Sequence, residues 1–445
     1  MDSFRYDDGE LFGEGVRLTD LAAHVGTPTY VYSAATLTGH YDRLAAAFAP
    51  LRPLICYSVK SCSNIHVLRS LAARGCGMDV VSGGELRRAR LAGVPGERIV
   101  FAGVGKTERE IADALGGSAG AHEIDDAPIA QFNVESEPEY ELIASIARTM
   151  NARGVAAIRV NPAIEAGHHA YVATGAAHSK FGVPPEHARE LIRRFAHEKH
   201  LSLAGIHLHL GSSIADTAPF VEAVRKALEL IDALARDGVT VTALDLGGGF
   251  AADYESDTSP SYTEYAAALV PLLRERAAAG LRIILEPGRT ISANAGVLLT
   301  RVLYVKLTGP KKYIVCDAGM HTLIRPALYG SFHFVWPAAV APQHEPPRRA
   351  ERLDLPGLEP CDVVGPVCES ADFLARERPL PPLARGDLLA VFSAGAYGMS
   401  MASRYNSHPL PAEVLIDGSR ARIIRRRESP EDLTLHEIEP EDVPF

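Results

Sequence analysis

Lys60 is the residue of this sequence whose position most directly indicates chemistry. It closes a short apolar run, Pro53 to Val59, and a helical pattern from Asn64 to Arg74 follows. A lysine at the end of a buried strand is costly if it is charged and unpaired. A carboxylate partner would remove this cost, and so would neutralisation, for example as a Schiff base with a carbonyl cofactor. The position alone leaves these readings open.

Two further groups follow apolar runs later in the chain. Gly247-Gly248-Gly249 is a loop of bare amides, which can approach an anion closely. A flexible turn is the simpler reading of a glycine triplet, but the nearby cation Arg289 favours phosphate. Glu286 could form a salt bridge with an arginine, or it could keep a pyridine nitrogen protonated.

A cofactor pocket would explain these groups together. His209 could be a core histidine, or it could stack on an aromatic ring. A lysine for a carbonyl, amides plus an arginine for a phosphate and a carboxylate for a ring nitrogen indicate pyridoxal 5′-phosphate. We expect no metal site. The nearest candidate ligands, His207 and His209, are expected to point to opposite faces of their strand.

Eight short apolar runs alternate with helical patterns and must position these groups. The runs lie near residues 53–59, 76–80, 98–101, 129–134, 154–160, 202–209, 241–246 and 281–285. Amphipathic patterns between them predict helices, for example over 137–150, 219–236 and 262–279. Eight such repeats in about 245 residues predict an α/β fold, a (β/α)8 TIM barrel. A doubly wound sheet is less consistent, because no Gly-x-Gly-x-x-Gly turn follows the first run.

In a TIM barrel the active site forms at the carboxyl ends of the strands. The residues capable of chemistry fall at those positions and would share one rim: Lys60, Asp79, Arg159, His209, Gly247 to Gly249, and Glu286.

After residue 295 the pattern changes to β-branched runs separated by Pro- and Gly-rich loops. The runs lie at 297–306, 313–317, 388–393, 412–416 and 419–425, and they predict a C-terminal antiparallel β domain of sandwich or Greek-key type. We therefore divide the chain into a segment 1–35 that joins the β domain, a barrel 36–295, the β domain 296–427 and an acidic tail 428–445. The Pro- and Arg-rich stretch 337–360 is expected to be an exposed loop.

Composition excludes several classes of protein. The formal net charge of −10, from 45 basic and 55 acidic residues, argues against a nucleic-acid partner. No run reaches the ~18 apolar residues of a membrane span. The first thirty residues are acidic and mixed, so a cytoplasmic location is expected. The six cysteines form no C-x-x-C pair and are expected to be free thiols.

Motifs spread over nearly the whole chain point to one family. They include Tyr57-Ser58-Val59-Lys60, Gly77-Met78-Asp79-Val80, Ser179-Lys180-Phe181-Gly182, Glu286-Pro287-Gly288-Arg289 and Gly365-Pro366-Val367-Cys368-Glu369. With them the sequence resembles the fold-type III pyridoxal-phosphate-dependent decarboxylases, which have an alanine racemase-like barrel, and among these the diaminopimelate decarboxylases. The resemblance implies decarboxylation of meso-2,6-diaminopimelate to L-lysine and CO₂, the last step of lysine biosynthesis.

The resemblance also implies a role for each matching residue. Lys60 would carry the cofactor and His209 would stack on its ring. Glu286 would lie at the ring nitrogen, and the rest of the cofactor site would comprise Asp79, Arg159, Ser212, Gly247, Gly248, Gly249, Gly288, Arg289 and Tyr397. The substrate would contact Arg289, Arg325, Tyr329, Glu369 and Tyr397. Cys368 would protonate the substrate carbon after CO₂ leaves. Cys368 and Glu369 would reach into a partner's barrel, which implies a homodimer with shared active sites.

The substrate assignment has a physical basis. Arg325 and Tyr329 suit a distal carboxylate and Glu369 suits a distal ammonium group, and diaminopimelate carries both. Three alternatives stay open: a related decarboxylase of a diamino acid or carrier-bound amino acid in secondary metabolism, a non-catalytic homologue, and an alanine racemase. The last would need a tyrosine in place of Cys368 and an arginine at the ring nitrogen.

Overall fold

The computed structural model describes residues 3–117, 127–164, 180–256, 258–437 and 439. The chain divides into two compact units. Unit 1 comprises residues 1–35, 254–256 and 293–445, and unit 2 comprises residues 36–253 and 257–292. Ser179 of the motif quoted above, and residues 438 and 440–445 of the predicted tail, lie outside the described residues.

Unit 2 is a closed barrel of eight parallel strands, as the apolar runs predict. Neighbours pair in chain order, and the last strand pairs with the first. The strands are β5 (Leu54–Ser58), β6 (Gly77–Val80), β7 (Ile99–Phe101), β8 (Gln131–Val134), β9 (Gly154–Arg159), β10 (Leu201–His207), β11 (Ala243–Asp245) and β12 (Arg282–Leu285). The last residue of each strand lies at the end expected from sequence or one to two residues before it. The apolar runs can be longer than the strands because apolar residues continue past the last hydrogen bond between strands.

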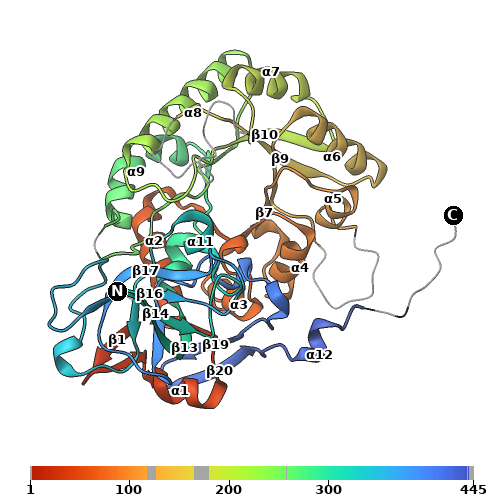
Figure 1. Ribbon diagram of the computed structural model, residues 1–445. Helices are drawn as coiled ribbons and strands as arrows, with labels where there is room; N and C mark the ends of the chain where they lie inside the picture. The colour runs from red at the N-terminus through yellow and green to blue at the C-terminus, as the bar shows by residue number, and fades with distance from the viewer. Residues whose placement is uncertain (1–2, 118–126, 165–179, 257, 438, 440–445) are drawn as a thin grey trace. The chain divides into compact units, whose positions relative to one another are not determined.

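Helices surround the ring of strands (Figure 1). They are α2 (Ala34–Phe48), α3 (Ile65–Ala72), α4 (Gly83–Leu91), α5 (Glu108–Ala114), α6 (Glu137–Thr149), α7 (Pro185–Phe195), α8 (Ala218–Arg236), α9 (Tyr262–Ala278) and α10 (Arg289–Ser292). Local chemistry sets where they begin: the Ser261 hydroxyl accepts from the Glu264 amide at the start of α9, and Glu264 reaches back to Ser261. Buried side chains on α8 recur at helical spacing, at Phe220, Val224, Ala227, Ile231 and Leu234.

The barrel interior has an apolar layer and a polar layer. Leu54, Cys56, Val100 and Ile284 form a buried cluster. Because side chains alternate along a strand, the residues two positions further on share the interior face. On β5 and β12 these are Ser58 and Glu286, so a polar layer follows at the carboxyl ends of the strands.

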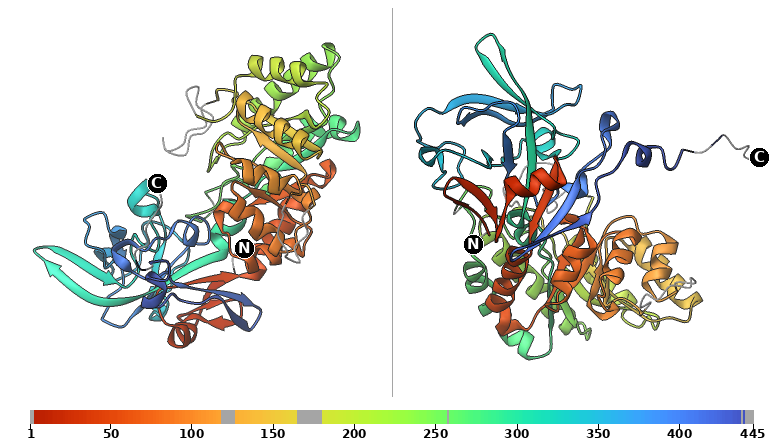
Figure 2. Two further views of the ribbon diagram at one scale, coloured as in Figure 1. Left: turned by 90° about the vertical axis from the view of Figure 1, so that its right-hand side faces the viewer. Right: turned by 90° about the horizontal axis from the view of Figure 1, so that it is seen from below.

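Unit 1 contains one sheet of nine strands. They are β4 (Thr29–Ser33), β13 (Gly296–Thr308), β14 (Lys311–Cys316), β15 (Val335–Pro337), β16 (Glu359–Val364), β17 (Phe373–Leu380), β18 (Leu388–Val391), β19 (Ala412–Asp417) and β20 (Arg420–Arg425). The order is β17-β16-β14-β13-β4-β19-β20, with β18 on β13 and β15 on β18. Figure 2 shows β13 and β14 as a long hairpin. A smaller sheet holds β1 (Phe4–Asp7), β2 (Glu10–Gly13) and β3 (Val16–Arg17), and the helices are α1 (Leu18–Val25), α11 (Arg325–Tyr329) and α12 (Pro430–Leu433).

The expectation of a purely antiparallel sheet was wrong in two places. β14 pairs with β16 in parallel, and so does β19 with β4. A hairpin can only join antiparallel strands, but both of these pairs are connected through long intervening segments, which permit either direction. The stretch 337–360 is also not all loop, since β15 ends at Pro337 and β16 begins at Glu359.

The six cysteines are free, as expected, and only Cys368 is exposed. No helix in the described part of the chain is long and apolar enough to span a membrane.

Candidate active site

Lys60 has a carboxylate partner. It lies in a short 3-10 turn, Val59–Ser61, directly after β5, and its Nζ donates to Asp79 Oδ2 at 2.9 Å. Asp79 is fully buried on the neighbouring strand β6, where Oδ2 also accepts from the Ser58 hydroxyl at 2.7 Å. The other oxygen, Oδ1, is buried without a hydrogen-bond partner among the described residues. The first reading of Lys60, a carboxylate pair, is therefore realised here, and a free acceptor remains beside it.

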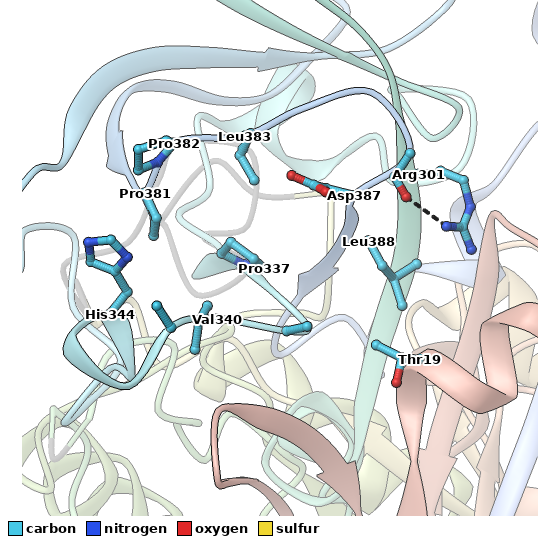
Figure 3. A pocket seen from close by; sticks show the side chains of 13 residues that line it. Thr19, Arg301, Pro337, Val340, His344, Pro381, Pro382, Leu383, Asp387 and Leu388 are labelled. Carbon is cyan, nitrogen blue, oxygen red and sulfur yellow. Dashed lines mark hydrogen bonds between the residues drawn. The ribbon is translucent and has the colours of Figure 1, made fainter.

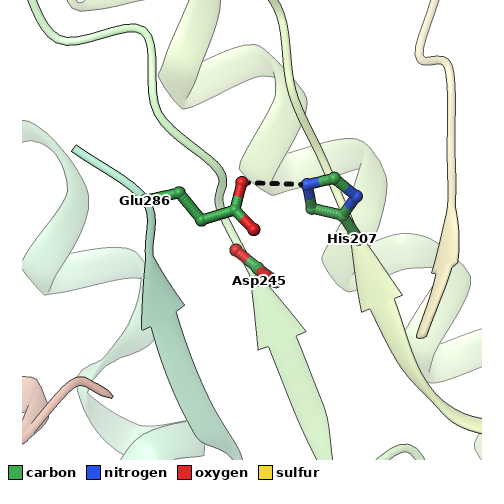
Figure 4. Close-up of side chains that lie close together, drawn as sticks. All are labelled: His207, Asp245 and Glu286. Carbon is green, nitrogen blue, oxygen red and sulfur yellow. Dashed lines mark hydrogen bonds and ion pairs between the residues drawn. The ribbon is translucent and has the colours of Figure 1, made fainter. Parts of the chain in front are cut away.

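Glu286 lies across the same layer, directly after β12. Its Oε1 accepts from Asn133 Nδ2 at 2.8 Å, and its Oε2 lies 3.3 Å from His207 Nε2. The same Asn133 nitrogen also donates to Asp245 Oδ2 at 3.1 Å, so one amide bridges two carboxyl groups. Figure 4 shows the Asp245 carboxyl beside that of Glu286, with His207 facing them. No arginine salt bridge holds Glu286 in the part of the chain that the structure describes.

Burial dominates the electrostatics of this group. It raises the pKa of Glu286 above its usual range, with a further rise from the charge of Asp79. Burial lowers the pKa of His207 to about 4, so this imidazole is neutral at pH 7. The Glu286 carboxyl should therefore lose its proton, and become charged, when a cation is placed beside it.

The glycine triplet is a packed loop rather than a flexible turn. A Cβ on Gly248 would lie 2.4 Å from the Glu286 carbonyl oxygen, and one on Gly247 would lie 2.2 Å from the Leu208 carbonyl oxygen. Gly247 also has a φ of +67°, which favours glycine. The Gly248 amide donates to His209 Nδ1 at 3.2 Å, which orients the imidazole and assigns the ring proton to Nε2. The loop thus fixes His209 at the carboxyl end of the barrel.

Arg289 and Ser212 are brought together beside this loop. Arg289 opens α10, is 8% exposed, and donates from Nε to the Ser212 hydroxyl at 2.9 Å. Gly288 precedes it, and a Cβ there would lie 2.9 Å from Ser58 Cβ. The ends of neighbouring strands therefore carry a guanidinium, a hydroxyl and a glycine loop. Together these groups can bind an anion.

Arg159 is engaged within the barrel. Its Nη1 donates to Glu135 Oε1 at 2.7 Å, and both side chains are buried. Its guanidinium also lies 4.6 Å from the centre of the Phe181 ring. The structure therefore gives Arg159 a buried ion-pair partner near the predicted rim.

Arg325 and Tyr329 lie together in unit 1, at the two ends of α11. The Arg325 guanidinium lies 5.8 Å from the Tyr329 ring centre and 5.3 Å from that of Tyr254. Its Nη2 donates to the Ser331 hydroxyl at 3.1 Å. These contacts orient a planar cation that can bind a carboxylate with two hydrogen bonds.

Cys368 and Glu369 are exposed in the loop between β16 and β17. The Cys368 amide donates to Asn406 Oδ1 at 3.0 Å, and Glu369 Oε2 accepts from the Tyr405 hydroxyl at 2.8 Å. Asp372 anchors the loop, since its carboxyl accepts from the amides of Met320 and Val367 at 2.6 Å each. The loop thus presents a thiol and a carboxylate at adjacent positions.

Tyr397, also in unit 1, follows β18 and has a φ of +55°. This is an uncommon conformation for a non-glycine residue.

Sequence reasoning missed the buried polar group around Glu286. This group comprises His207, Asp245 and Glu286. One ring nitrogen of His207 and one carboxyl oxygen of each acidic residue all lie within 4.8 Å of one another. The argument used for His207 and His209 was also faulty, since residues two apart on a strand share a face, and His209 lies beyond the end of β10. The signal for His207 and Asp245 was present, because each is a polar residue at the last position of its barrel strand. Asn133 gave a weaker signal, since it lies inside β8, which also contains Gln131.

A separate pocket of about 440 Å³ lies in unit 1 (Figure 3). Its lining includes Thr19, Arg301, Pro337, His344, Asp387 and Leu388. None of the residues predicted from sequence to bind cofactor or substrate lines it.

Comparison with known proteins identifies the family. Residues 34–293 match the model of the pyridoxal-dependent decarboxylase family, pyridoxal binding domain. The diaminopimelate decarboxylase of Aquifex aeolicus is 42% identical over 425 residues, 95% of this chain and 94% of that protein. The enzyme of the same name from Pseudomonas aeruginosa is 43% identical over 433 residues, 97% and 98% of the two chains.

Solved structures agree with this. The diaminopimelate decarboxylase of M. jannaschii in complex with L-lysine superposes with a TM-score of 0.88 at 33% identity, covering 99% of this chain and 98% of that one. The chain therefore belongs to the pyridoxal-dependent decarboxylases, and within them to the diaminopimelate decarboxylase family.

Proposed function

We propose that the protein uses pyridoxal 5′-phosphate to decarboxylate meso-2,6-diaminopimelate to L-lysine and CO₂. The observation that carries the proposal is the set of groups on one barrel rim: the Lys60–Asp79 pair, the buried Glu286 carboxyl, and Arg289 with Ser212 beside the glycine loop. The identity of over 40% to enzymes of this name, over nearly the full chain, supports the same reaction.

The residues present fit the cofactor. The glycine loop leaves no room for a Cβ, so a phosphate could come close to its backbone, and Arg289 supplies the positive charge. The amides of Gly247 and Gly248 already donate to Asp245 and His209 and would fix the loop in place. Asp79 Oδ1 has an unused acceptor beside Lys60. Glu286 is a carboxyl whose raised pKa would be lowered by a protonated ring nitrogen. When bound, pyridoxal phosphate supplies a conjugated ring system that accepts the electrons released by loss of CO₂.

Each barrel residue then has a defined task. Lys60 would hold the cofactor, and Asp79 keeps the Lys60 amino group in place through their hydrogen bond. Glu286 would hold a proton at the ring nitrogen, and His209, oriented by the Gly248 amide, would contact the ring. Arg289, Ser212, Gly288 and the glycine loop bind the phosphate, and Arg159 with Glu135 supports the rim from the neighbouring strands.

The unit 1 residues would recognise the distal end of the substrate. Arg325, held against two tyrosine rings, binds the distal carboxylate with Tyr329, and Arg289 assists from the barrel. Glu369, held by the Tyr405 hydroxyl, binds the distal ammonium group. Tyr397 would contact cofactor and substrate. The Cys368 thiol returns a proton to the carbon that has lost CO₂.

We further propose a cytoplasmic homodimer in which Cys368 and Glu369 of one subunit complete the site of the other. Two observations support this. The Cys368 loop is exposed in unit 1, and all six cysteines are free, which fits a reducing compartment. We also propose the domain boundaries expected from sequence: a segment 1–35 that joins the β domain, the barrel 36–295, the β domain 296–427 and the tail 428–445.

Substrate preference tests the proposal. With pyridoxal phosphate present, kcat/KM should be highest for meso-diaminopimelate and far lower for lysine and ornithine, which lack the distal carboxylate. Arg325→Gln should raise KM for diaminopimelate more than it lowers kcat, because the contact lies far from the bond that breaks. Arg376→Gln, which removes an exposed arginine of β17, is the matched control. A preference for lysine or ornithine would refute the substrate assignment.

A further inference from the structure

We propose that Asp245 is a positioning residue: it keeps a proton at neutral pH and donates it as a hydrogen bond toward Glu286, so that Glu286, and not Asp245, takes the negative charge when a cation is brought to the pair. The inference rests on the proposed role of Glu286 at the ring nitrogen. It adds a residue that neither the sequence motifs nor the family comparison assigns.

Asp245 and Glu286 are too close together, and too deeply buried, for both carboxyls to be charged. Asp245 is fully buried and Glu286 is 2% exposed, and oxygens of the two carboxyls lie within 4.8 Å of each other. Two carboxylates this close in a buried site do not both ionise readily, and one retains a proton.

The partners of Asp245 are neutral. Its Oδ1 accepts from the Gly247 amide at 2.9 Å, and its Oδ2 accepts from the Asn133 side chain at 3.1 Å. No ion pair joins it to a lysine or arginine within the described ranges. Glu286 faces the site where the cofactor's cation would lie, so the charge belongs on Glu286 and the proton on Asp245.

The charged groups around the pair also favour a protonated Asp245 and a charged Glu286. Burial, and then the charge of Glu286, raises the pKa of Asp245 well above its usual range. The titratable and charged groups around the pair come from several strands and strand ends: Cys56, Lys60, Asp79, Glu135, Arg159 and His207. Lys60 and Arg159 favour the charged form of Glu286. His207 is neutral and adds no cation that would ionise Asp245.

Asn133 fixes the two carboxyls relative to each other. Its Nδ2 donates to both, and its Oδ1 accepts from Gln131 Nε2 at 2.7 Å, so the amide cannot turn without losing a bond. With the orientation of Asn133 set in this way, its side-chain nitrogen faces both carboxyls and cannot accept a proton from Asp245, whereas the neighbouring Glu286 carboxylate can.

Infrared spectroscopy of the protein labelled with ¹³C-aspartate tests the proton directly, with and without pyridoxal phosphate. The carbonyl band of a protonated aspartic acid should be present at neutral pH in both forms. The band should disappear in Asp245→Asn and persist in Asp79→Asn, which removes the other buried barrel aspartate near Glu286. Only carboxylate bands in the wild-type protein would overturn the proposal.

Cofactor affinity tests the positioning role. Asparagine can still donate to Glu286, whereas leucine of similar size cannot. Asp245→Leu should therefore bind pyridoxal phosphate at least tenfold more weakly than Asp245→Asn, measured by titration of the apoproteins. Equal affinities would overturn the role. The proposed function would survive that result if the wild-type enzyme still released lysine from diaminopimelate, so the two failures are distinguishable.

Discussion

Gly248→Ala should weaken cofactor binding through a displacement that the structure defines. The added Cβ would lie 2.4 Å from the Glu286 carbonyl oxygen, whereas real Cβ contacts stay beyond 3.0 Å. One of the two backbones must therefore move by at least 3.0 − 2.4 = 0.6 Å. The same substitution brings the Cβ to 3.5 Å from His209 Cε1. Both backbones belong to the proposed cofactor site, so neither can yield without moving a functional group.

The size of the effect follows from that displacement. Since a misplacement of about 1 Å can cost on the order of 100-fold in rate, we expect kcat/KM to fall by roughly 10- to 100-fold. The apparent affinity for pyridoxal phosphate should fall as well, because the loop amides and the Gly248–His209 hydrogen bond shift together. Titration of the apoprotein with cofactor and steady-state kinetics measure the two effects.

The matched control is Gly105→Ala. A Cβ at Gly105 meets nothing within 4 Å, so this variant should bind cofactor and turn over as the wild type does. Wild-type affinity and rate in Gly248→Ala would refute the packed-loop account of the glycine triplet.

Three further predictions concern the ring-nitrogen carboxyl, a partly buried carboxyl of α4 and the shared site. Glu286→Gln should retain the cofactor but lose about 100-fold or more in kcat, ~2.7 kcal/mol at the transition state, and near-native turnover would leave Glu286 a structural role. Burial raises the pKa of Glu85 to about 7, so its folded form holds a proton that the unfolded chain has released. Stability should therefore fall as pH rises from about 4.5 to 7, by at most about 3 kcal/mol, and denaturant titrations should show a flatter profile for Glu85→Gln, with an unchanged profile as the contrary result. Lys60→Ala and Cys368→Ala should each be inactive, and subunit exchange between them should restore up to about a quarter of wild-type activity; no recovery after demonstrated exchange would contradict the shared site.

The barrel could be predicted from sequence because its strands are buried on both sides. Parallel strands of this kind are nearly continuous apolar runs, as β5 and β9 show. The residues that follow parallel strands all lie at the same end of the barrel. The sequence alone therefore predicts that Lys60 and Glu286 lie in one layer.

The partners of these residues could not be predicted in the same way. Asn133, His207 and Asp245 are far apart in sequence and meet only because β8, β10 and β11 are neighbours or near-neighbours around a closed ring. Taken one at a time they are polar residues at or near the ends of strands, and only the register brings Asn133 within reach of two carboxyls. Strand direction in unit 1 was predicted wrongly for a related reason, because the pairing of β4 with β19 joins segments at opposite ends of the chain.

The covalent attachment of the cofactor tests the account most directly. Borohydride reduction of the pyridoxal-phosphate-loaded protein, followed by proteolysis and mass spectrometry, should place the pyridoxyl group on Lys60. The buried Lys106 is a built-in comparison, because its amino group is committed to Glu139 at 2.6 Å and to two backbone carbonyls. A pyridoxyl group on Lys106 or on any lysine other than Lys60, or on none, would contradict the account.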